Sequence, residues 1–330
     1  MAEHRACKPE FHRKLLLLAA VSISVMLSVA HVSHAQSPTA AKSSPSTPGK
    51  LEFDVASVRQ NKSGLPGAGG DESSVNIPMG PEATFRNTGG VFSATNMPLN
   101  SFISFAYKVT TSQRAAFRAS LPDWALTEGF NIQARTDKPN VTKDEMRMMM
   151  RALLADRFKL VVHTETREVP VFAVELVKPG TLGPHLRPHP ADEPCSTIAP
   201  PLGQPNPDAP PPPPRIMADG YPTICGGFAN MEPTVPGRRH EGSRDMPIPT
   251  MVTAFSGLGN LGRPAIDQTG LTGNFDWVIE FVQEAPGEET DAPGPRFQEA
   301  LKDQLGLKLV PQKAPFEFLV VTHVEHPSEN

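Results

Sequence analysis

Two histidine–glutamate pairs have residue types and a spacing that could bind a metal ion or relay a proton. His163 and Glu165 lie two residues apart, and so do His323 and Glu325. On a strand, residues two apart point to the same face, so each pair would place an imidazole beside a carboxylate. Neither pair has a third ligand nearby, and charges on exposed strands also keep sheets from aggregating. We therefore expect solvated strand surfaces and no metal, with these four residues as candidate ligands.

Asp267 opens a string that could carry an acid catalyst. The string Asp267-Gln268-Thr269-Gly270 differs by one inserted residue from the Asp-Thr-Gly loop of aspartic proteases. Such catalysis needs a second carboxylate close enough to share a proton, and Asp276 or Glu280 could supply it. The alternative is a turn in which the Asp267 carboxylate accepts backbone hydrogen bonds. We expect the turn, and we keep a secreted hydrolase that uses Asp267 as an alternative.

A glycine-rich string at 257–262 has the spacing of a dinucleotide-binding loop. Such a loop binds a pyrophosphate only where it follows a strand and opens a helix, whereas this one follows a helix-like segment and leads into Pro264. The sequence contains no Gly-x-Ser-x-Gly, His-Glu-x-x-His or phosphate-loop string, and no nucleophile beside a local base. We therefore expect no cofactor and a function that does not depend on catalysis.

Two tryptophans are candidate ligand contacts. Trp124 and Trp277 each lie near the turn or strand before the second helix of a repeated unit described below. An exposed indole could stack on a sugar or a peptide, whereas a buried one would anchor a core. We expect core positions and keep ligand contact as the alternative for both.

Cys195 and Cys225 are candidates for a disulfide. They are the cysteines that remain once an N-terminal export signal, which contains Cys7, is removed. Exported chains with an even number of thiols commonly oxidise them, and a bridge closing a loop of about 30 residues would contribute roughly 3–4 kcal/mol. Two free thiols are the alternative.

Two stretches of the chain, 97–177 and 246–325, contain the same landmarks in the same order. Each begins with Met-Pro and an aliphatic residue, continues through two helix-like segments, and closes with two apolar strands. The second helices end in similar strings at 154–160 and 301–307. Such repetition predicts two related small units, each with the order strand–helix–strand–helix–strand–strand, an α+β fold and its own apolar core.

Local signals place several elements inside these units. Thr142 and Glu145 have the spacing of a capping box, and the methionine-rich helix that follows should direct Met148 away from the core. The closing strands of the first unit should be joined by a turn near residues 166–167. Those of the second unit should be joined by a connector at 311–315.

The ends of these units follow from changes in composition. Arg13 and Lys14 precede the apolar run 15–32 and small residues at 33 and 35, which predicts a signal peptide, with an uncleaved anchor as the alternative. The predicted organisation is then listed in chain order: signal peptide 1–35, disordered tether 36–50, first unit 51–178, Pro-rich linker 179–222 and second unit 223–330.

Net charge limits the class of partner. The 31 basic and 35 acidic residues of the whole chain fall to 27 and 33 once residues 1–35 are removed. So mild an acidity argues against nucleic acid or an acidic membrane surface as the main partner. We also expect no membrane span after signal cleavage, because no later segment is sufficiently apolar.

Several strings together resemble one family. They are Phe-Asp-Val-Ala-Ser-Val at 53–58, Leu-Leu-Ala-Asp-Arg-Phe at 153–158, Cys-Gly-Gly at 225–227, Gly-Arg-Pro at 262–264, Asp-Gln-Thr-Gly-Leu-Thr-Gly at 267–273, Gln-Leu-Gly-Leu-Lys-Leu at 304–309 and His-Pro-Ser-Glu-Asn at 326–330. This set is similar to the soil-associated protein family abundant in Acidobacteria. The resemblance implies an exported protein without an established activity. Some relatives carry the region on a membrane metallopeptidase of the antibiotic-sensor type, but the zinc motif is missing here.

The order of elements in each unit is also similar to that of the short N-terminal domains of secretins and TonB-dependent receptors, which bind partner proteins in the periplasm. Together these observations predict an exported periplasmic or secreted protein that binds an envelope protein or polymer without catalysis. A secreted hydrolase using Asp267 and a sensor module for cell-wall fragments are the alternatives.

Overall fold

Strands and helices alternate along the chain and assemble into three sheets, which confirms the α+β class. The computed structural model describes residues 51–66, 70–81, 85, 87–193, 219–223, 225–283 and 293–327. All of them belong to one unit, Gly49–Asn330. The predicted signal peptide, the tether and Cys195 lie outside the described residues and stay predictions.

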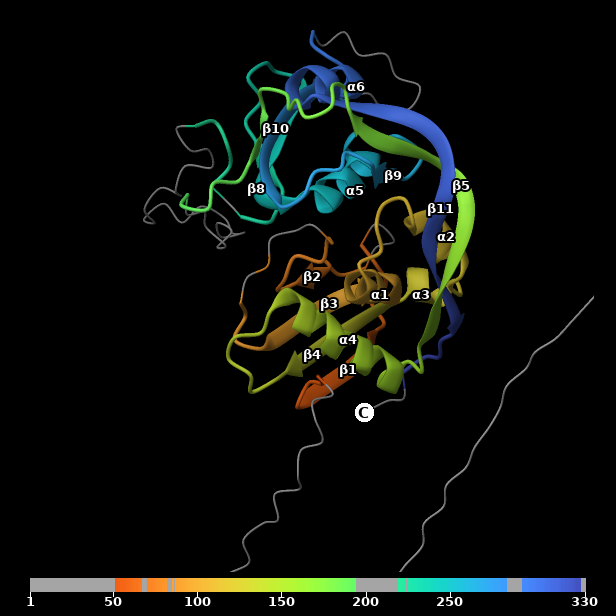
Figure 1. The fold of residues 1–330 in the computed structure, drawn as a ribbon. Helices are drawn as coiled ribbons and strands as arrows, with labels where there is room; N and C mark the ends of the chain where they lie inside the picture. The colour runs from red at the N-terminus through yellow and green to blue at the C-terminus, as the bar shows by residue number, and fades with distance from the viewer. Residues whose placement is uncertain are drawn as a thin grey trace, which may run out of the picture. The chain divides into compact units, whose positions relative to one another are not determined.

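The first sheet is antiparallel, with the strand order β1-β4-β3-β2 (Figure 1). Its strands are β1 (Val55–Asn61), β2 (Ser74–Val75), β3 (Val91–Pro98) and β4 (Gly129–Arg135). The helices of this part of the chain are α1 (Leu99–Tyr107), α2 (Arg114–Ala119), α3 (Trp124–Thr127) and α4 (Lys143–Arg157). Apolar side chains of α1 and α4 join those of β3 and β4 in a first core.

Helix α4 begins with the capping box that the sequence predicts. The Thr142 hydroxyl accepts a hydrogen bond from the Glu145 N–H at 3.2 Å, and the Glu145 carboxylate accepts one from the Thr142 N–H at 2.9 Å. Two N–H groups at the helix start, which lack partners within the helix, are thereby satisfied. The methionines on the core face are fully buried, whereas Met148 is 42% exposed, as its position on the helix predicts.

The second sheet has the strand order β6-β10-β8-β7 and is also antiparallel. Its strands are β6 (Leu186–Pro188), β7 (Ala229–Met231), β8 (Arg238–Pro247) and β10 (Asn274–Val282), with helices α5 (Ile248–Leu258) and α6 (Phe297–Ala300), the latter continued by a π-helical turn, η1 (Leu301–Leu305). Strand β6 corrects the interpretation of 179–222 as only a linker. Leu186 is buried in the second core, so this short segment gains apolar contacts as well as strand pairing.

Strand β3 of the first sheet and strand β8 of the second end in the same way. β3 and β8 each run directly into a helix at a proline, Pro98 or Pro247. Two residues before that proline the backbone is left-handed in both, with φ of 50° at Asn96 and 53° at Asp245. At the same place the pairing register shifts in both sheets, so each strand carries a β-bulge.

The closing strands differ from the prediction. Instead of two short strands in each half, β5 (Val161–Leu176) and β11 (Leu307–His323) are long and pair with each other in an antiparallel ribbon (Figure 1). β9 (Ala265–Asp267) adds a parallel strand to β5. No turn forms near 166–167, because Arg167 pairs with Phe316 inside the ladder.

The prolines of β11 explain why the connector expected at 311–315 is a strand. Glu317 O accepts a hydrogen bond from Gln113 Nε2, and Val321 N–H donates to Ser120 Oγ, so odd-numbered residues direct their backbone groups away from β5. Pro311 and Pro315 are odd-numbered and lie in the same uninterrupted register. Their missing N–H groups therefore cost no hydrogen bond to β5, as expected for prolines tolerated at an edge.

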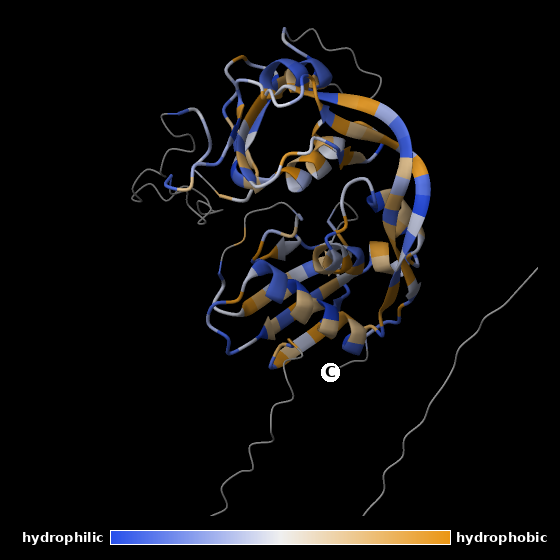
Figure 2. Ribbon diagram, in the orientation of Figure 1, coloured by the Kyte–Doolittle hydropathy of each residue, from blue (hydrophilic) through white to orange (hydrophobic). Residues whose placement is uncertain are grey.

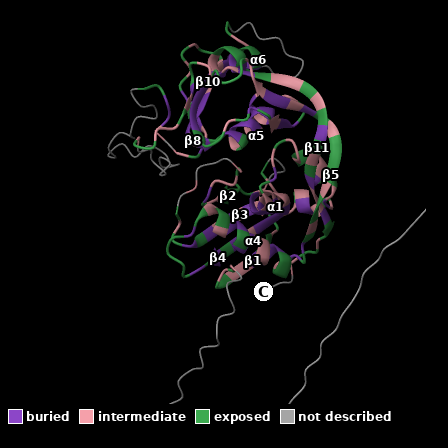
Figure 3. Ribbon diagram, viewed as in Figure 1, coloured by how far each residue is buried: buried purple, intermediate pink, exposed green. Residues whose placement is uncertain are grey.

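The apolar interior consists of one large core for each four-stranded sheet and a small cluster of Tyr221, Ala229, Met231 and Val278. Apolar residues alternate along the ribbon (Figures 2 and 3). The prediction that each unit has an independent core is wrong. Val321 of β11 belongs to the first core, whereas Val174 of β5 belongs to the second. Each half of the chain thus sends its last strand to complete the other half's core. Within the described residues, no helix is long and apolar enough to cross a membrane.

Candidate functional site

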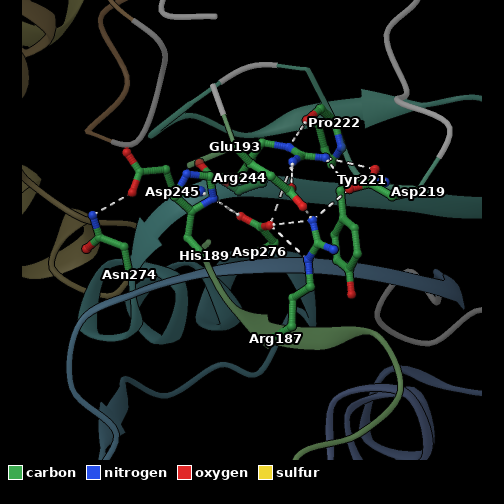
Figure 4. Close-up of polar contacts among 11 residues, drawn as sticks. Arg187, His189, Glu193, Asp219, Tyr221, Pro222, Arg244, Asp245, Asn274 and Asp276 are labelled. Atoms are coloured by element: carbon green, nitrogen blue, oxygen red, sulfur yellow. Dashed lines mark hydrogen bonds and ion pairs between the residues drawn. The ribbon is translucent and has the colours of Figure 1, made fainter. Parts of the chain in front are cut away.

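A cluster of buried charges lies at the bulge of the second sheet (Figure 4). We call it the arginine cluster; its members are Arg187, His189, Glu193, Asp219, Arg244 and Asp276. Asp276 on β10 is 0% exposed and Arg244 on β8 is 1% exposed. The bulge sets these two residues face to face, because Arg244 and Asp245 together lie opposite Asp276 where the register shifts.

Asp276 is the buried acceptor of the cluster. Its Oδ2 accepts from Arg187 Nε at 3.0 Å, and its Oδ1 accepts from the Asp245 N–H at 3.0 Å. The His189 Nδ1 lies 2.7 Å from Oδ1, and since an ionised carboxylate only accepts, Nδ1–H is the donor. Both oxygens of this carboxylate are therefore engaged by protein groups.

Arg244 is the buried donor. Its Nη2 donates to both oxygens of Asp219 at 2.7 and 2.8 Å, and its Nη1 lies 2.8 Å from Glu193 Oε2. Its Nε donates to Pro222 O at 2.9 Å. The Tyr221 ring lies against both guanidinium groups, 4.4 Å from Arg187 Cζ and 5.9 Å from Arg244 Cζ, which adds cation–π attraction.

The contacts in the cluster favour the charged forms of Asp219 and Arg187. Burial disfavours the charge on Asp219, but hydrogen bonds from Arg244 and the Tyr221 N–H, with the nearby guanidinium charges, outweigh burial and hold its pKa below the usual range. Burial likewise opposes the charge on Arg187, yet its contact with Asp276 raises the Arg187 pKa. Burial raises the pKa of the Tyr221 hydroxyl, so that group stays protonated at neutral pH.

A cleft of about 470 Å³ lies beside the cluster. Asp219 of the cluster lines it, as does Tyr221, which packs against the cluster's arginines. The other polar side chains that line the cleft include His185, Arg238, His240 and Glu280. Its volume falls in the range of about 300–1,000 Å³ that is typical of small-molecule sites. The cluster fixes one wall of this cleft, because Asp219 and Tyr221 are held by two arginines.

The polar groups of the cluster are bonded mainly to one another. Among the described residues, His189 contacts Asp276, and no serine, threonine or cysteine is hydrogen-bonded to its ring. A general acid or base needs a group able to exchange a proton with a ligand, whereas both Asp276 oxygens are occupied. The cluster is therefore suited to holding one wall of the cleft rigid.

The acids singled out from the sequence have separate partners. Asp267 Oδ1 accepts from Thr269 N–H at 2.9 Å and from the Thr269 hydroxyl at 2.8 Å, as expected for the turn. Asp276 belongs to the arginine cluster. Glu280 accepts from the Thr234 N–H and hydroxyl at 2.8 and 2.6 Å. Burial opposes ionisation of Glu280, but these hydrogen bonds hold its pKa below the usual range.

In each histidine–glutamate pair, the imidazole contacts the carboxylate of the same pair. His163 Nε2 lies 3.0 Å from Glu165 Oε1, and His323 Nε2 lies 2.8 Å from Glu325 Oε1, with all four side chains at least one-third exposed. Hydrogen bonds from Arg167 and then His163 hold the Glu165 pKa below its usual range. In the described part of the chain no group of three or more potential ligands could hold a metal ion.

The tryptophans occupy different surroundings. Trp277 is 0% exposed and packs edge-on against Phe228 and Phe255, so it cannot contact a ligand from solvent. Trp124 is partly exposed and stacks on the His326 ring, with centroids 3.9 Å apart.

Cys225 forms a β-bridge with Arg244, next to the cluster. Its proposed partner Cys195 lies outside the described residues, so the disulfide stays a prediction.

Sequence reasoning missed five members of the cluster: Arg187, His189, Glu193, Asp219 and Arg244. One signal could have found part of it. The landmarks align Phe130 with Phe275, which places Asn131 and Asp276 at matching positions, and a change from amide to carboxylate there calls for cations nearby. The partners in 187–193 could not be found this way, because they lie in the segment interpreted as linker.

One family model matches the chain. Residues 100–324 of the 330 match a model described as a protein of unknown function, DUF3738. The match runs from α1 to the end of β11 and so includes β4, the second sheet and the ribbon. No curated protein and no solved structure matched. Because the match covers more than half of its length, the chain belongs to the DUF3738 family of proteins of unknown function.

Proposed function

We propose that this chain is an exported, non-catalytic binding module of the cell envelope, and that the cleft beside the arginine cluster is its binding site. The observation that carries the proposal is the combination of a cleft of about 470 Å³ with a wall held by two arginines. A preformed wall reduces the conformational entropy lost on binding, which is how rigid sites gain affinity.

Binding is favoured over catalysis by the state of the polar groups. The described acids that a hydrolase would need are committed to a turn, to the cluster, and to the backbone at Thr234. A hydrolase that used Asp267 would lose turnover in an Asp267→Asn variant while keeping its stability. For a turn we expect Asp267→Ala to lose stability, because Asp267 Oδ1 accepts two hydrogen bonds, whereas Asn keeps that acceptor.

The proposal includes two related α+β units. Their common origin is supported by the shared strand order and by the left-handed residues Asn96 and Asp245 before Met-Pro. A second matched pair follows the second helices, where φ is 50° at Lys159 and 71° at Gly306. Export is supported by the charged start, apolar run and small-residue site within 1–35. The partner is an envelope protein or polymer.

The test measures retention of residues 36–330 on purified envelope fractions, with cell-wall polymer and membrane proteins kept separate. We expect one fraction to retain the protein and a Tyr221→Leu variant to bind it at least several-fold less. Tyr107→Leu is the matched control, because Tyr107 also lies beneath an arginine, 4.7 Å from Arg151 Cζ, outside the cleft.

A second variant guards against loss of folding. His185→Ala removes an exposed side chain from the cleft, and His163→Ala removes an exposed histidine elsewhere. Thermal midpoints of all variants are measured in parallel. The proposal is overturned when neither fraction retains the wild-type protein, or when cleft and control variants are retained equally.

A further inference from the structure

The acids that line the cleft have most of their acceptor capacity occupied by protein donors. Both Asp219 oxygens accept from Arg244, and Oδ2 also accepts from Arg187 at 2.6 Å. Glu280 Oε1 accepts from the Thr234 and Val235 N–H groups, and its Oε2 accepts from the Thr234 hydroxyl. A ligand that enters the cleft therefore meets an Asp219 carboxylate that accepts four hydrogen bonds and a Glu280 carboxylate with acceptor capacity left only on Oε2.

Arg238, in contrast, has hydrogen-bond donors that remain available to a ligand. Its Nε donates to Pro293 O at 2.8 Å, and the guanidinium lies against Gly294, where an added Cβ would come within 2.5 Å of Nε. Gly294 also has a φ of 144°, a conformation that other residues rarely adopt. The group is thus held in one place, while its Nη1 and Nη2 have no hydrogen-bond partner among the described residues.

Three further groups in the cleft can face a ligand. His240 Nδ1 lies 2.8 Å from Glu232 O, and since a carbonyl only accepts, Nδ1 carries the proton and Nε2 remains for a ligand. The Tyr221 hydroxyl and the His185 ring have no hydrogen-bond partner within the described chain. The free Nε2 of this His240 tautomer is an acceptor, so the donor capacity of the cleft comes chiefly from Nη1 and Nη2 of Arg238, with the Tyr221 hydroxyl beside them.

We infer that the cleft binds a short peptide through its free C-terminal carboxylate, with Arg238 as the residue that binds the anion. This inference rests on the proposed function, because it takes the cleft to be the binding site. A guanidinium can donate two parallel hydrogen bonds to a carboxylate. The ionised Asp219 and Glu280 in the lining would repel a phosphate dianion more strongly than a carboxylate of single charge.

The remaining walls suit the rest of a small peptide. Pro184, Val278 and Pro295 contribute apolar surface to the cleft. A volume of about 470 Å³ accommodates two or three residues, and a ligand of this size binds at about millimolar affinity when no other contacts add to it.

The test is an NMR titration of ¹⁵N-labelled residues 36–330, which contain the whole unit Gly49–Asn330. The probe is N-acetyl-alanyl-alanine, and its C-terminal amide is the matched ligand without the charge. We expect the acid to bind at least ten-fold more tightly than the amide, and to shift resonances of residues that line the cleft.

The matched variants are Arg238→Gln and Arg239→Gln, at adjacent positions on β8. Arg239 is engaged by Glu241 at 2.7 Å and does not line the cleft. We expect Arg238→Gln to weaken binding of the acid at least ten-fold and Arg239→Gln to change it less than two-fold. Should Arg238→Gln fail to fold, Arg238→Lys, which keeps the charge but loses the fork, is expected to weaken binding several-fold.

Equal affinity for acid and amide, or unchanged binding by a folded Arg238 variant, overturns the inference. When the probe fails but an envelope fraction still retains the protein through Tyr221, only the ligand assignment is wrong. When neither the probe nor any fraction binds, the proposed function fails with it.

Discussion

The bulges of the two sheets solve the same backbone problem with different chemistry. In the first sheet Asn131 Oδ1 accepts from the Asn96 N–H at 2.8 Å and from Asn61 Nδ2 at 3.3 Å. In the second sheet Asp276 Oδ1 accepts from the Asp245 N–H at 3.0 Å and from His189 Nδ1 at 2.7 Å. Asn131, Asn96 and Asn61 thus correspond to Asp276, Asp245 and His189. The central acceptor is an amide in the first sheet and a carboxylate in the second.

This difference explains why the arginine cluster exists in the second sheet. A buried amide needs only hydrogen-bond partners, whereas a buried carboxylate also needs compensating charge. Arg187 and Arg244 supply that charge, and Asp219 and Glu193 in turn balance the arginines. The cost of burying one carboxylate is therefore met by a network that also fixes a wall of the cleft.

Removing the Asp276 carboxylate should have the largest effect on stability and should best distinguish the two sheets. We expect Asp276→Ala to lower the free energy of unfolding by about 3–5 kcal/mol, because two arginines lose a buried partner. Asn131→Ala, its counterpart in the first sheet, should cost about 1–3 kcal/mol for unsatisfied hydrogen bonds. Urea unfolding followed by circular dichroism measures both, and equal losses would show that charge is not the difference.

The next effect concerns the predicted disulfide, which would strengthen only the second of the two sheets. Glu193 precedes Cys195 by two residues, and Cys225 bridges to Arg244, so the predicted disulfide would fasten the cluster's partners together. We expect Cys225→Ser to lower the free energy of unfolding by about 3–4 kcal/mol relative to the oxidised protein. Two free thiols in a thiol titration of the unreduced, denatured protein would contradict this.

The left-handed residues should respond differently to glycine. Asn96→Gly relieves backbone strain but loses the hydrogen bonds from Asn96 Nδ2 to Gly64 O and Asp71 O, so we expect a net loss of about 1–2 kcal/mol. Asp245→Gly loses one exposed contact with Asn274 and should change stability by less than about 1 kcal/mol. Thermal unfolding compares the two, and the reverse order would weaken the correspondence.

The smallest effect is a dependence on pH. Because the folded-state pKa of Asp219 is lowered, its stabilisation is fully present above the ordinary value of about 4 and is lost as the pH falls through the folded pKa. We expect Asp219→Asn to be less stable at pH 7 but to lose less stability between pH 5 and pH 2 than the wild type. Asn131→Ala should keep the wild-type slope, since the amide does not titrate.

Elements fixed by neighbouring residues could be predicted from the sequence. The capping box at Thr142 and Glu145 and the exposure of Met148 follow from positions on one helix, and both are as predicted. The α+β class followed from the order of the segments with helix-like and strand-like apolar patterns. The turn at Asp267 also depends on nearby residues alone.

Features fixed by distant residues could not be predicted in this way. Strands β5 and β11 are continuous because each forms the backbone hydrogen bonds of the other. Considered with only their sequence neighbours, Pro311 and Pro315 instead favour a connector. Strand β6 is only three residues long and depends on pairing with β10. The arginine cluster joins residues up to 89 apart, and no local spacing encodes that meeting.

The exchange of closing strands has a consequence for the order in which the molecule is completed. The side chains of Leu319, Val321 and Val324 complete a core whose other members come from residues 51–162. We therefore expect this core to stay open to water in a chain that still lacks residues 319–330. The N-terminal half would then finish folding only after the C-terminal strand is available, whatever the speed at which its local helices form.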